Sequence, residues 1–430
     1  MAAAVSPVIE LGELRRGGEA DEPAPAPVRP PGRVARMVAV CCLALLSLAA
    51  AAPPARPPVG SRVAAAQGAM FLVLADRLVV ADGPGTAGLG GRVVTGHGLP
   101  GGEPLWRFTL AAGDRVLGLS AVAGGLLVTS SPAGAGQTLS TLLDPATGAV
   151  RWRHSGYLVS TASGGVLFET SPRTGAGGTI VAVDPASGAV RWSLPLPNSG
   201  AAYRTGDRGV TQIVLASPDG RVEVHDADSG ALLHAGRVPP AADRVAYRFS
   251  QVVAGLLLVD GAAGTVTAYG LDRLDRRWSV PVESPGGAWF VECGGMVCIR
   301  DQIGGVRALD PVTGRLSWMD DRWAGLAPVG GRLLGVGPEL ELSVLDPATG
   351  RAITRLGRWR LTGFGSDPTR LLGLRRLTGD RMLAATLDLA SGEARIRAVL
   401  PGWWDECADS GGSLVCLRPS GGLMIWPVGR

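Results

Sequence analysis

Four cysteines are the residues whose spacing points most directly to chemistry. They form two local pairs, in WFVECGGMVCIR (Cys293 and Cys298) and in WWDECADSGGSLVCLR (Cys407 and Cys416). Each pair encloses an even number of residues, so in a hairpin the two cysteines face each other in register, at a separation that a disulfide accepts. We expect both pairs to be oxidised, which places this part of the chain in an oxidising compartment outside the cytoplasm.

The same cysteines do not indicate a metal site. Zinc sites use CxxC spacing with further Cys or His ligands nearby. The four histidines of the chain show no such grouping: His97, His154, His225 and His234. We therefore expect no metal; the expectation of no cofactor rests on the family resemblance given below.

A recurring aspartate is the second candidate for chemistry. It occurs in TLLDPATGAVRW, VAVDPASGAVRW and RALDPVTGRLSW, with Gly four residues after it and Trp eight residues after it. The three copies contain Asp144, Gly148 and Trp152; Asp184, Gly188 and Trp192; and Asp310, Gly314 and Trp318. Pro presets φ, Asp and Ser or Thr bond the local backbone, and Gly supplies positive φ, so the phrase predicts a tight turn between strands.

No catalytic residue is indicated. Aspartates at equivalent positions of successive turns lie far apart, so no two of them are spaced for general acid and base catalysis. Asp405 and Glu406 are adjacent, and on a strand they point to opposite faces. The sequence contains no GxSxG, HExxH or P-loop motif.

The aspartate phrase belongs to a longer repeat that sets the fold class. Its last position recurs, with weaker copies included, at 106, 152, 192, 234, 278, 318, 354 and 396, in steps of 36 to 46 residues. The weaker copies are Asp226, Gly230 and His234; Asp346, Gly350 and Thr354; Asp388, Gly392 and Ile396; and the isolated Trp106 and Trp278. Alternating apolar runs flank each turn, so the unit consists of strands, and a period of this size is typical of propeller blades.

We expect an all-β chain with a single β-propeller of eight blades, or seven as the alternative. Each repeat tryptophan falls on the strand that leaves the turn, where its face can pack on the next blade. After the eighth copy, three strand-like stretches remain at 402–406, 413–418 and 421–428. They resemble a blade whose fourth strand comes from the amino-terminal part of the chain, which closes the ring and hides its edges.

The repeated phrase resembles the tryptophan-docking motif of propellers of the pyrroloquinoline-quinone (PQQ) type. This family includes quinoprotein dehydrogenases and BamB-like assembly proteins, and the resemblance covers about residues 98–430. The dehydrogenases hold the quinone over a vicinal disulfide and a calcium ion. Here the vicinal cysteines are Cys41 and Cys42, inside an apolar segment before the repeats. The resemblance thus implies the repeat without the cofactor site.

The first part of the chain is predicted to anchor the protein in a membrane and not to form part of a folded core. Residues 1–36 carry five acidic residues and five Arg among Ala, Pro and Gly, and we interpret them as a disordered cytoplasmic tail. The run from Met37 to Ala52 is uncharged and follows Arg29, Arg33 and Arg36. We expect a transmembrane helix at 37–55, with the amino terminus cytoplasmic. A cleaved signal peptide is the rival interpretation, because small residues follow the apolar run.

These features predict a 56–68 linker and a propeller at 69–430 that lies outside the cytoplasmic membrane. We expect a non-catalytic binding or scaffold protein, not an enzyme; the alternative is a PQQ-dependent quinoprotein dehydrogenase or another extracytoplasmic enzyme. The expected partners are the membrane and an unidentified protein or cell-envelope ligand. The net charge of +4 and the scattered arginines do not favour nucleic acid.

Trp289, Trp403 and Trp404 lie just before the two cysteine pairs. They are candidates for an interaction surface, because aromatic residues are frequent anchors in interfaces; burial in the core is the competing interpretation. The segment Val8 to Leu14 (VIELGEL) is a candidate contact for a cytoplasmic protein.

Overall fold

The computed structural model describes Met37 and residues 60–427, apart from 83–91, 135–136, 171–177, 207, 240–249, 261–263, 283–288, 301–304, 363–369 and 410–411. Contacts divide the chain into two units, Met1–Arg56 and Pro57–Arg430. The expected tail and membrane helix lie outside the described residues except for Met37, which is helical. Among the residues that are described, no helix is long and apolar enough to cross a membrane.

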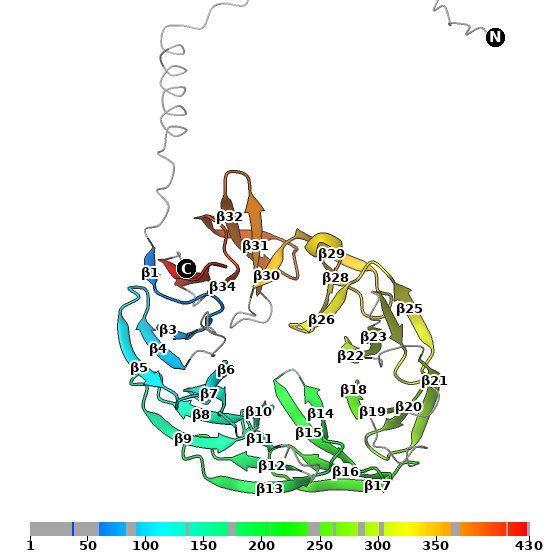
Figure 1. Cartoon of the computed structure of the whole chain (residues 1–430). Helices are drawn as coiled ribbons and strands as arrows, with labels where there is room; N and C mark the ends of the chain where they lie inside the picture. The colour runs from blue at the N-terminus through cyan, green and yellow to red at the C-terminus, as the bar shows by residue number, and fades with distance from the viewer. Residues whose placement is uncertain are drawn as a thin grey trace, which may run out of the picture. The chain divides into compact units, whose positions relative to one another are not determined.

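The described part of the second unit forms nine antiparallel sheets of four strands each, arranged as a ring of blades (Figure 1). In blades 1 to 4 the strands are β2 (Met70–Val73), β3 (Arg77–Ala81), β4 (Val93–Gly98) and β5 (Pro104–Thr109); β6 (Arg115–Val122), β7 (Gly125–Ser131), β8 (Leu139–Leu143) and β9 (Val150–Ser155); β10 (Tyr157–Ser160), β11 (Val166–Thr170), β12 (Gly178–Val183) and β13 (Val190–Leu196); and β14 (Ala201–Gly206), β15 (Gly209–Ala216), β16 (Arg221–Asp226) and β17 (Leu232–Arg237).

Blades 5 to 8 continue the same order. Their strands are β18 (Ser250–Val253), β19 (Leu256–Asp260), β20 (Thr265–Gly270) and β21 (Arg276–Pro281); β22 (Trp289–Cys293), β23 (Met296–Arg300), β24 (Val306–Leu309) and β25 (Leu316–Asp320); β26 (Gly325–Val329), β27 (Arg332–Val336), β28 (Glu341–Leu345) and β29 (Ala352–Arg358), with a short 3₁₀ turn at Pro338–Leu340; and β30 (Arg360–Thr362), β31 (Arg370–Leu377), β32 (Arg381–Asp388) and β33 (Ala394–Pro401). The first strand of each blade lies toward the centre of the ring and the last toward its rim (Figure 1).

Blade 9 combines the two ends of the propeller. Its strands run in the order β1 (Ser61–Val63), β36 (Leu423–Pro427), β35 (Ser413–Leu417) and β34 (Glu406–Asp409). β1 pairs with β36, with Ser61 opposite Ile425 and Val63 opposite Leu423. The expected closure by an amino-terminal strand is therefore present, and the segment interpreted as a 56–68 linker contains that strand.

The expectation of eight blades, with seven as the alternative, is wrong. Each of blades 1 to 8 carries a copy of the repeated phrase. Blade 9 is an additional blade that has no copy of it. The phrase spans the turn between the third and fourth strands. In blade 9 the fourth strand is supplied by β1, so this turn does not exist in the chain.

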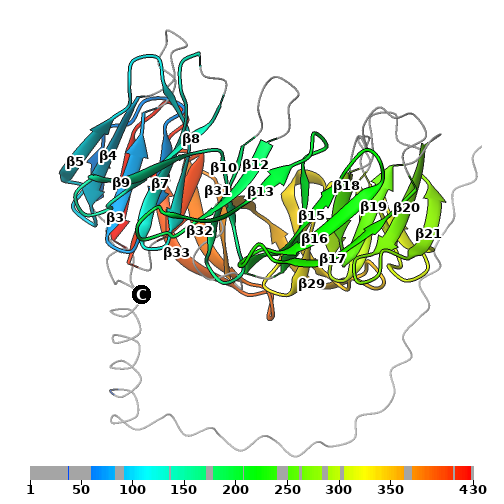
Figure 2. The same cartoon turned by 90° about the horizontal axis from the view of Figure 1, so that it is seen from below.

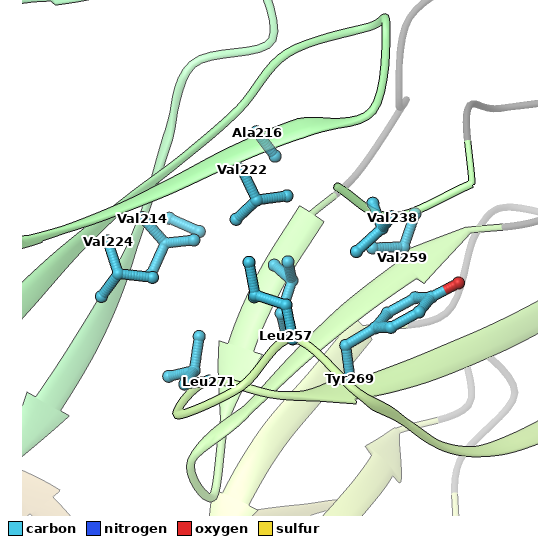
Figure 3. Packing of buried hydrophobic residues seen from close by; sticks show 11 residues of the cluster. Val214, Ala216, Val222, Val224, Val238, Leu257, Val259, Tyr269 and Leu271 are labelled. Atoms are coloured by element: carbon cyan, nitrogen blue, oxygen red, sulfur yellow. The ribbon is translucent and has the colours of Figure 1, made fainter. Parts of the chain in front are cut away.

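Apolar side chains between neighbouring sheets hold the blades together. Between blades 4 and 5, Val214, Val222 and Val224 meet Leu257 and Tyr269, and all five are buried (Figure 3). Equivalent clusters join the other neighbours, including Leu78 and Val80 of blade 1 with Leu423 and Ile425 of blade 9. The side view shows the sheets of successive blades following one another in chain order from cyan to green (Figure 2).

The repeated turn of each blade is the surface on which a residue of the preceding blade packs. In blade 3, the amide and hydroxyl of Ser187 donate to Asp184 Oδ1, and Gly188 has φ of +72°. Trp152 of blade 2 packs on this turn: its Nε1 donates to Pro185 O at 3.0 Å, and a Cβ built on Gly188 would lie 2.5 Å from its ring. The glycine is thus required twice, for its backbone conformation and for the indole above it.

The same docking recurs around much of the ring. Nε1 donates to a carbonyl of the following turn at 2.7 to 3.0 Å in five blades, in the pairs Trp106 with Pro145, Trp152 with Pro185, Trp192 with Asp228, Trp278 with Pro311 and Trp318 with Pro347. In blade 4 the last position of the repeated phrase is occupied by His234 in place of tryptophan, and its Nε2 contacts Leu271 O of blade 5. Each bond adds about 1 kcal/mol beyond the apolar burial of the ring.

Both disulfides are present. Cys407 and Cys416 lie directly opposite each other on β34 and β35, with Cα atoms 4.1 Å apart. Cys293 and Cys298 are bonded with Cα atoms 5.9 Å apart, but they are not in register. Cys293 is opposite Met296 and Cys298 is opposite Val291, because a two-residue Gly294–Gly295 turn closes this hairpin. The bridge is therefore diagonal, which corrects the expectation of a facing pair.

Candidate interaction surface at Trp403

Trp403 is exposed and Trp404 is buried among the tryptophans singled out from the sequence whose side chains the structure describes. Trp403 lies between β33 and β34, where the chain passes from blade 8 to blade 9, and 40% of it is accessible. The guanidinium carbons of Arg360 and Arg376 lie 5.0 and 5.3 Å from its ring centroid. Two cations on one exposed indole form an amphipathic surface of the kind that anchors protein interfaces.

The position of Arg360 is fixed by its neighbours. Its Nη1 donates to Asp405 Oδ1 at 2.8 Å, and its Nη2 donates to the backbone oxygen of Trp404. Arg360 is the first residue of β30, so the bonds connect the innermost strand of blade 8 to the crossing into blade 9. Its guanidinium is therefore oriented before any partner arrives.

Arg376 is the freer cation of the pair. It is exposed near the end of β31, and among the described residues no carboxylate forms an ion pair with it. A positive charge without an internal counter-ion favours an acidic partner and contributes mainly to specificity and association rate.

The interaction-surface hypothesis is wrong for Trp404. This residue is fully buried, its Nε1 donates to Pro401 O at 2.9 Å, and its ring meets Trp426 edge to face at 4.7 Å. Neighbouring residues of an extended segment point to opposite sides, so Trp403 and Trp404 cannot share one environment. Trp289 begins β22 opposite Arg300, and its side chain lies outside the described part of the structure.

Trp404 belongs to a second series of tryptophans, whose other members, Trp323 and Trp359, were not singled out from the sequence. Trp323, Trp359 and Trp404 are buried just before the innermost strands of blades 7, 8 and 9. An arginine stacks on each, with guanidinium carbons 5.6, 4.5 and 4.7 Å from the ring centroids, in the pairs Arg322 with Trp323, Arg375 with Trp359 and Arg418 with Trp404. The signal was available in the sequence as a tryptophan shortly before the first strand of each of these blades, in DRWAG, GRWRL and GWWDE.

The repeat aspartates have the properties of turn acceptors. Arg151 and the amide of Ala146 lower the pKa of Asp144, and the Ser187 hydroxyl and amide lower the pKa of Asp184. The amide and hydroxyl of Thr313 do the same for Asp310. An acid that stays ionised and is already bonded to its own turn is a poor proton donor. In the described part of the chain, no group of three or more His, Cys, Asp or Glu is arranged to hold a metal ion.

The fold and the docked tryptophans define a class: a β-propeller whose blades are joined by an indole on the next turn. A family model described as outer membrane protein assembly factor BamB matches residues 135–292, from blade 2 into blade 6. The blades within these residues have PQQ-like repeats of the kind that this model describes.

Solved structures with a similar fold include BamB from Moraxella catarrhalis, at 17% identity and a TM-score of 0.41, covering 86% of this chain and 99% of that one. A europium-containing methanol dehydrogenase is similar at 13% identity and a TM-score of 0.37, covering 64% and 72%. The search of curated proteins gave no match.

Proposed function

We propose that this chain is a non-catalytic binding or scaffold propeller, held at the outer face of the cytoplasmic membrane by a helix at 37–55, with its amino terminus in the cytoplasm. The observation that carries the proposal is the exposed Trp403 between Arg360 and Arg376. An exposed indole with oriented cations is suited to binding an acidic surface of a cell-envelope protein.

Two further observations support this proposal. The disulfides Cys293–Cys298 and Cys407–Cys416 are suited to an oxidising compartment. The matching family model carries the name of an outer membrane assembly factor, a role consistent with scaffolding.

The test compares partner capture by the wild-type protein and by Trp403→Ala, after cross-linking in intact cells, extraction from membranes and mass spectrometry. We expect Trp403→Ala to lose a reproducible cell-envelope partner while its melting temperature stays within 2–3 °C, because an exposed side chain contributes little to stability. Val312→Ala is the matched control, since Val312 is an apolar residue that is 71% exposed on the turn of blade 6.

Three outcomes contradict the proposal. One is an identical set of partners for the wild type and Trp403→Ala. Another is protection of the propeller from a protease added to cells whose outer envelope layers have been removed, so that the outer face of the cytoplasmic membrane is accessible. The third is a bound quinone detected by absorbance together with alcohol or sugar oxidation, which identifies a quinoprotein dehydrogenase.

A further inference from the structure

A pocket of about 340 Å³ lies beside the closing strand, where the chain leaves β1 and the β35–β36 turn meets it. Its polar lining comes from Arg62, Arg418 and Ser420, and its apolar lining includes Val63 and Leu423. No Asp or Glu is among the lining residues. A pocket whose charged groups are both cations has an unbalanced positive charge.

In the part of the chain that the structure describes, the two arginines, Arg62 and Arg418, have no carboxylate as a counter-ion. Arg62 is exposed on the outermost strand of blade 9, whereas Arg418 is half-buried. Their N–H groups are available to an anionic ligand.

Arg418 is held in place by the tryptophan below it. Its guanidinium carbon lies 4.7 Å from the ring centroid of Trp404, which is fully buried. A guanidinium stacked on an aromatic face keeps its in-plane N–H donors free and loses less entropy when a ligand binds.

The wall of the pocket is equally fixed. Gly422 N donates to Ala65 O at 2.8 Å, and Arg418 N donates to Gly422 O at 3.0 Å. Gly421 has φ of +89°, and a Cβ at this position would lie 2.8 Å from Ala65 O. The turn therefore packs directly on the segment that follows β1, and the pocket exists only when β1 closes the ring.

From this geometry we infer that the pocket is an anion site for a phosphate or carboxylate group, with Arg418 as its oriented donor and Arg62 as the second cation. Arginine presents paired N–H donors that match both groups, and such charge-assisted bonds are strong. The site goes beyond the proposed function, and its test does not depend on the partner bound at Trp403.

The experiment is calorimetric titration of the full-length protein with inorganic phosphate and, separately, with acetate. We expect one site that prefers one of the two anions, at least tenfold weaker binding in Arg418→Gln, and a smaller loss in Arg62→Gln. Arg273→Gln removes the same charge from an exposed position in blade 5 and serves as the control.

Tighter binding of phosphate indicates that the pocket takes a phosphorylated ligand. Tighter binding of acetate indicates that it takes an acidic side chain or the carboxyl terminus of a chain. The inference is overturned if neither anion binds. It is also overturned if Arg273→Gln weakens binding as much as Arg418→Gln, which would indicate a general charge effect. Circular dichroism and melting of Arg418→Gln establish that the propeller remains folded.

Discussion

At the scale of single residues, the repeated phrase requires a large side chain at its tryptophan and no side chain at its glycine. The tryptophan needs a flat surface on the next blade, and the glycine provides it by having no side chain. Trp152 lies on Gly188 in this way, and Trp318 lies on Gly350. Where the last position of the phrase is not aromatic, its side chain still contacts the glycine of the next blade: Thr354 Cγ2 occupies the space above Gly392. The glycines are therefore constrained by a neighbouring blade as well as by their own turn.

Gly188→Ala tests this double constraint, with Gly124→Ala as the matched control. Gly188 and Gly124 have φ of +72° and +71°, so alanine costs both about 1–2 kcal/mol of backbone strain. Only at Gly188 does the added Cβ meet an indole, and overpacking adds about 1–3 kcal/mol. We expect urea unfolding to give a clearly larger loss for Gly188→Ala. Equal losses for the two variants would contradict the docking argument.

At the scale of elements, the turn between the third and fourth strands contains an ionised acceptor. The pKa values of Asp144, Asp184, Asp226 and Asp310 all lie below the usual value because hydroxyl, amide or guanidinium donors bond the charged form. A carboxyl whose folded pKa is depressed stabilises the native state above the unfolded pKa, about 4, and this stability is lost as the pH falls through the folded value.

Asp310→Asn tests this linkage. The amide oxygen can still accept the bonds from Thr313, but the residue no longer takes up a proton on unfolding. We expect the free energy of unfolding, measured in urea, to fall less between pH 7 and pH 3 in Asp310→Asn than in the wild type. The idea fails if the two proteins show the same acid dependence.

The limits of sequence reasoning also appear at this scale. The strands, the turns and both disulfides follow from local patterns in the sequence. The closing blade was also expected from the strand-like stretches at 402–428, but the count of blades was one too low. This blade carries no copy of the repeated phrase, because its last turn is replaced by pairing between Val63 and Leu423 at opposite ends of the chain. The surface at Trp403 combines Arg360 and Arg376 from different strands of blade 8, and no spacing in the sequence indicates that contact. The Gly294–Gly295 turn shifted the register that cysteine spacing alone predicted.

At the scale of the whole molecule, closure of the ring depends on a strand of three residues. β1 contributes Val63, which is 2% exposed and packs with Leu423 and Ile425 of blade 9 and Leu78 of blade 1. Without β1, β36 presents an unpaired edge, and the contact between the first and last blades loses part of its core. The two ends of the propeller are thus joined by backbone pairing within blade 9, and blade 9 packs on blade 1 through side chains.

Val63→Asp tests whether this strand holds the ring closed. A carboxylate in this apolar cluster costs about 3 kcal/mol or more. We expect hydrogen exchange to accelerate first in blades 9 and 1, the two sheets that β1 joins, while the strands of blade 5 keep their protection. Arg62→Gln, an exposed change on the same strand, should leave both regions unaffected. Uniform acceleration around the ring would mean that the propeller unfolds as one cooperative unit, and that β1 contributes to general stability instead of serving as a local closure.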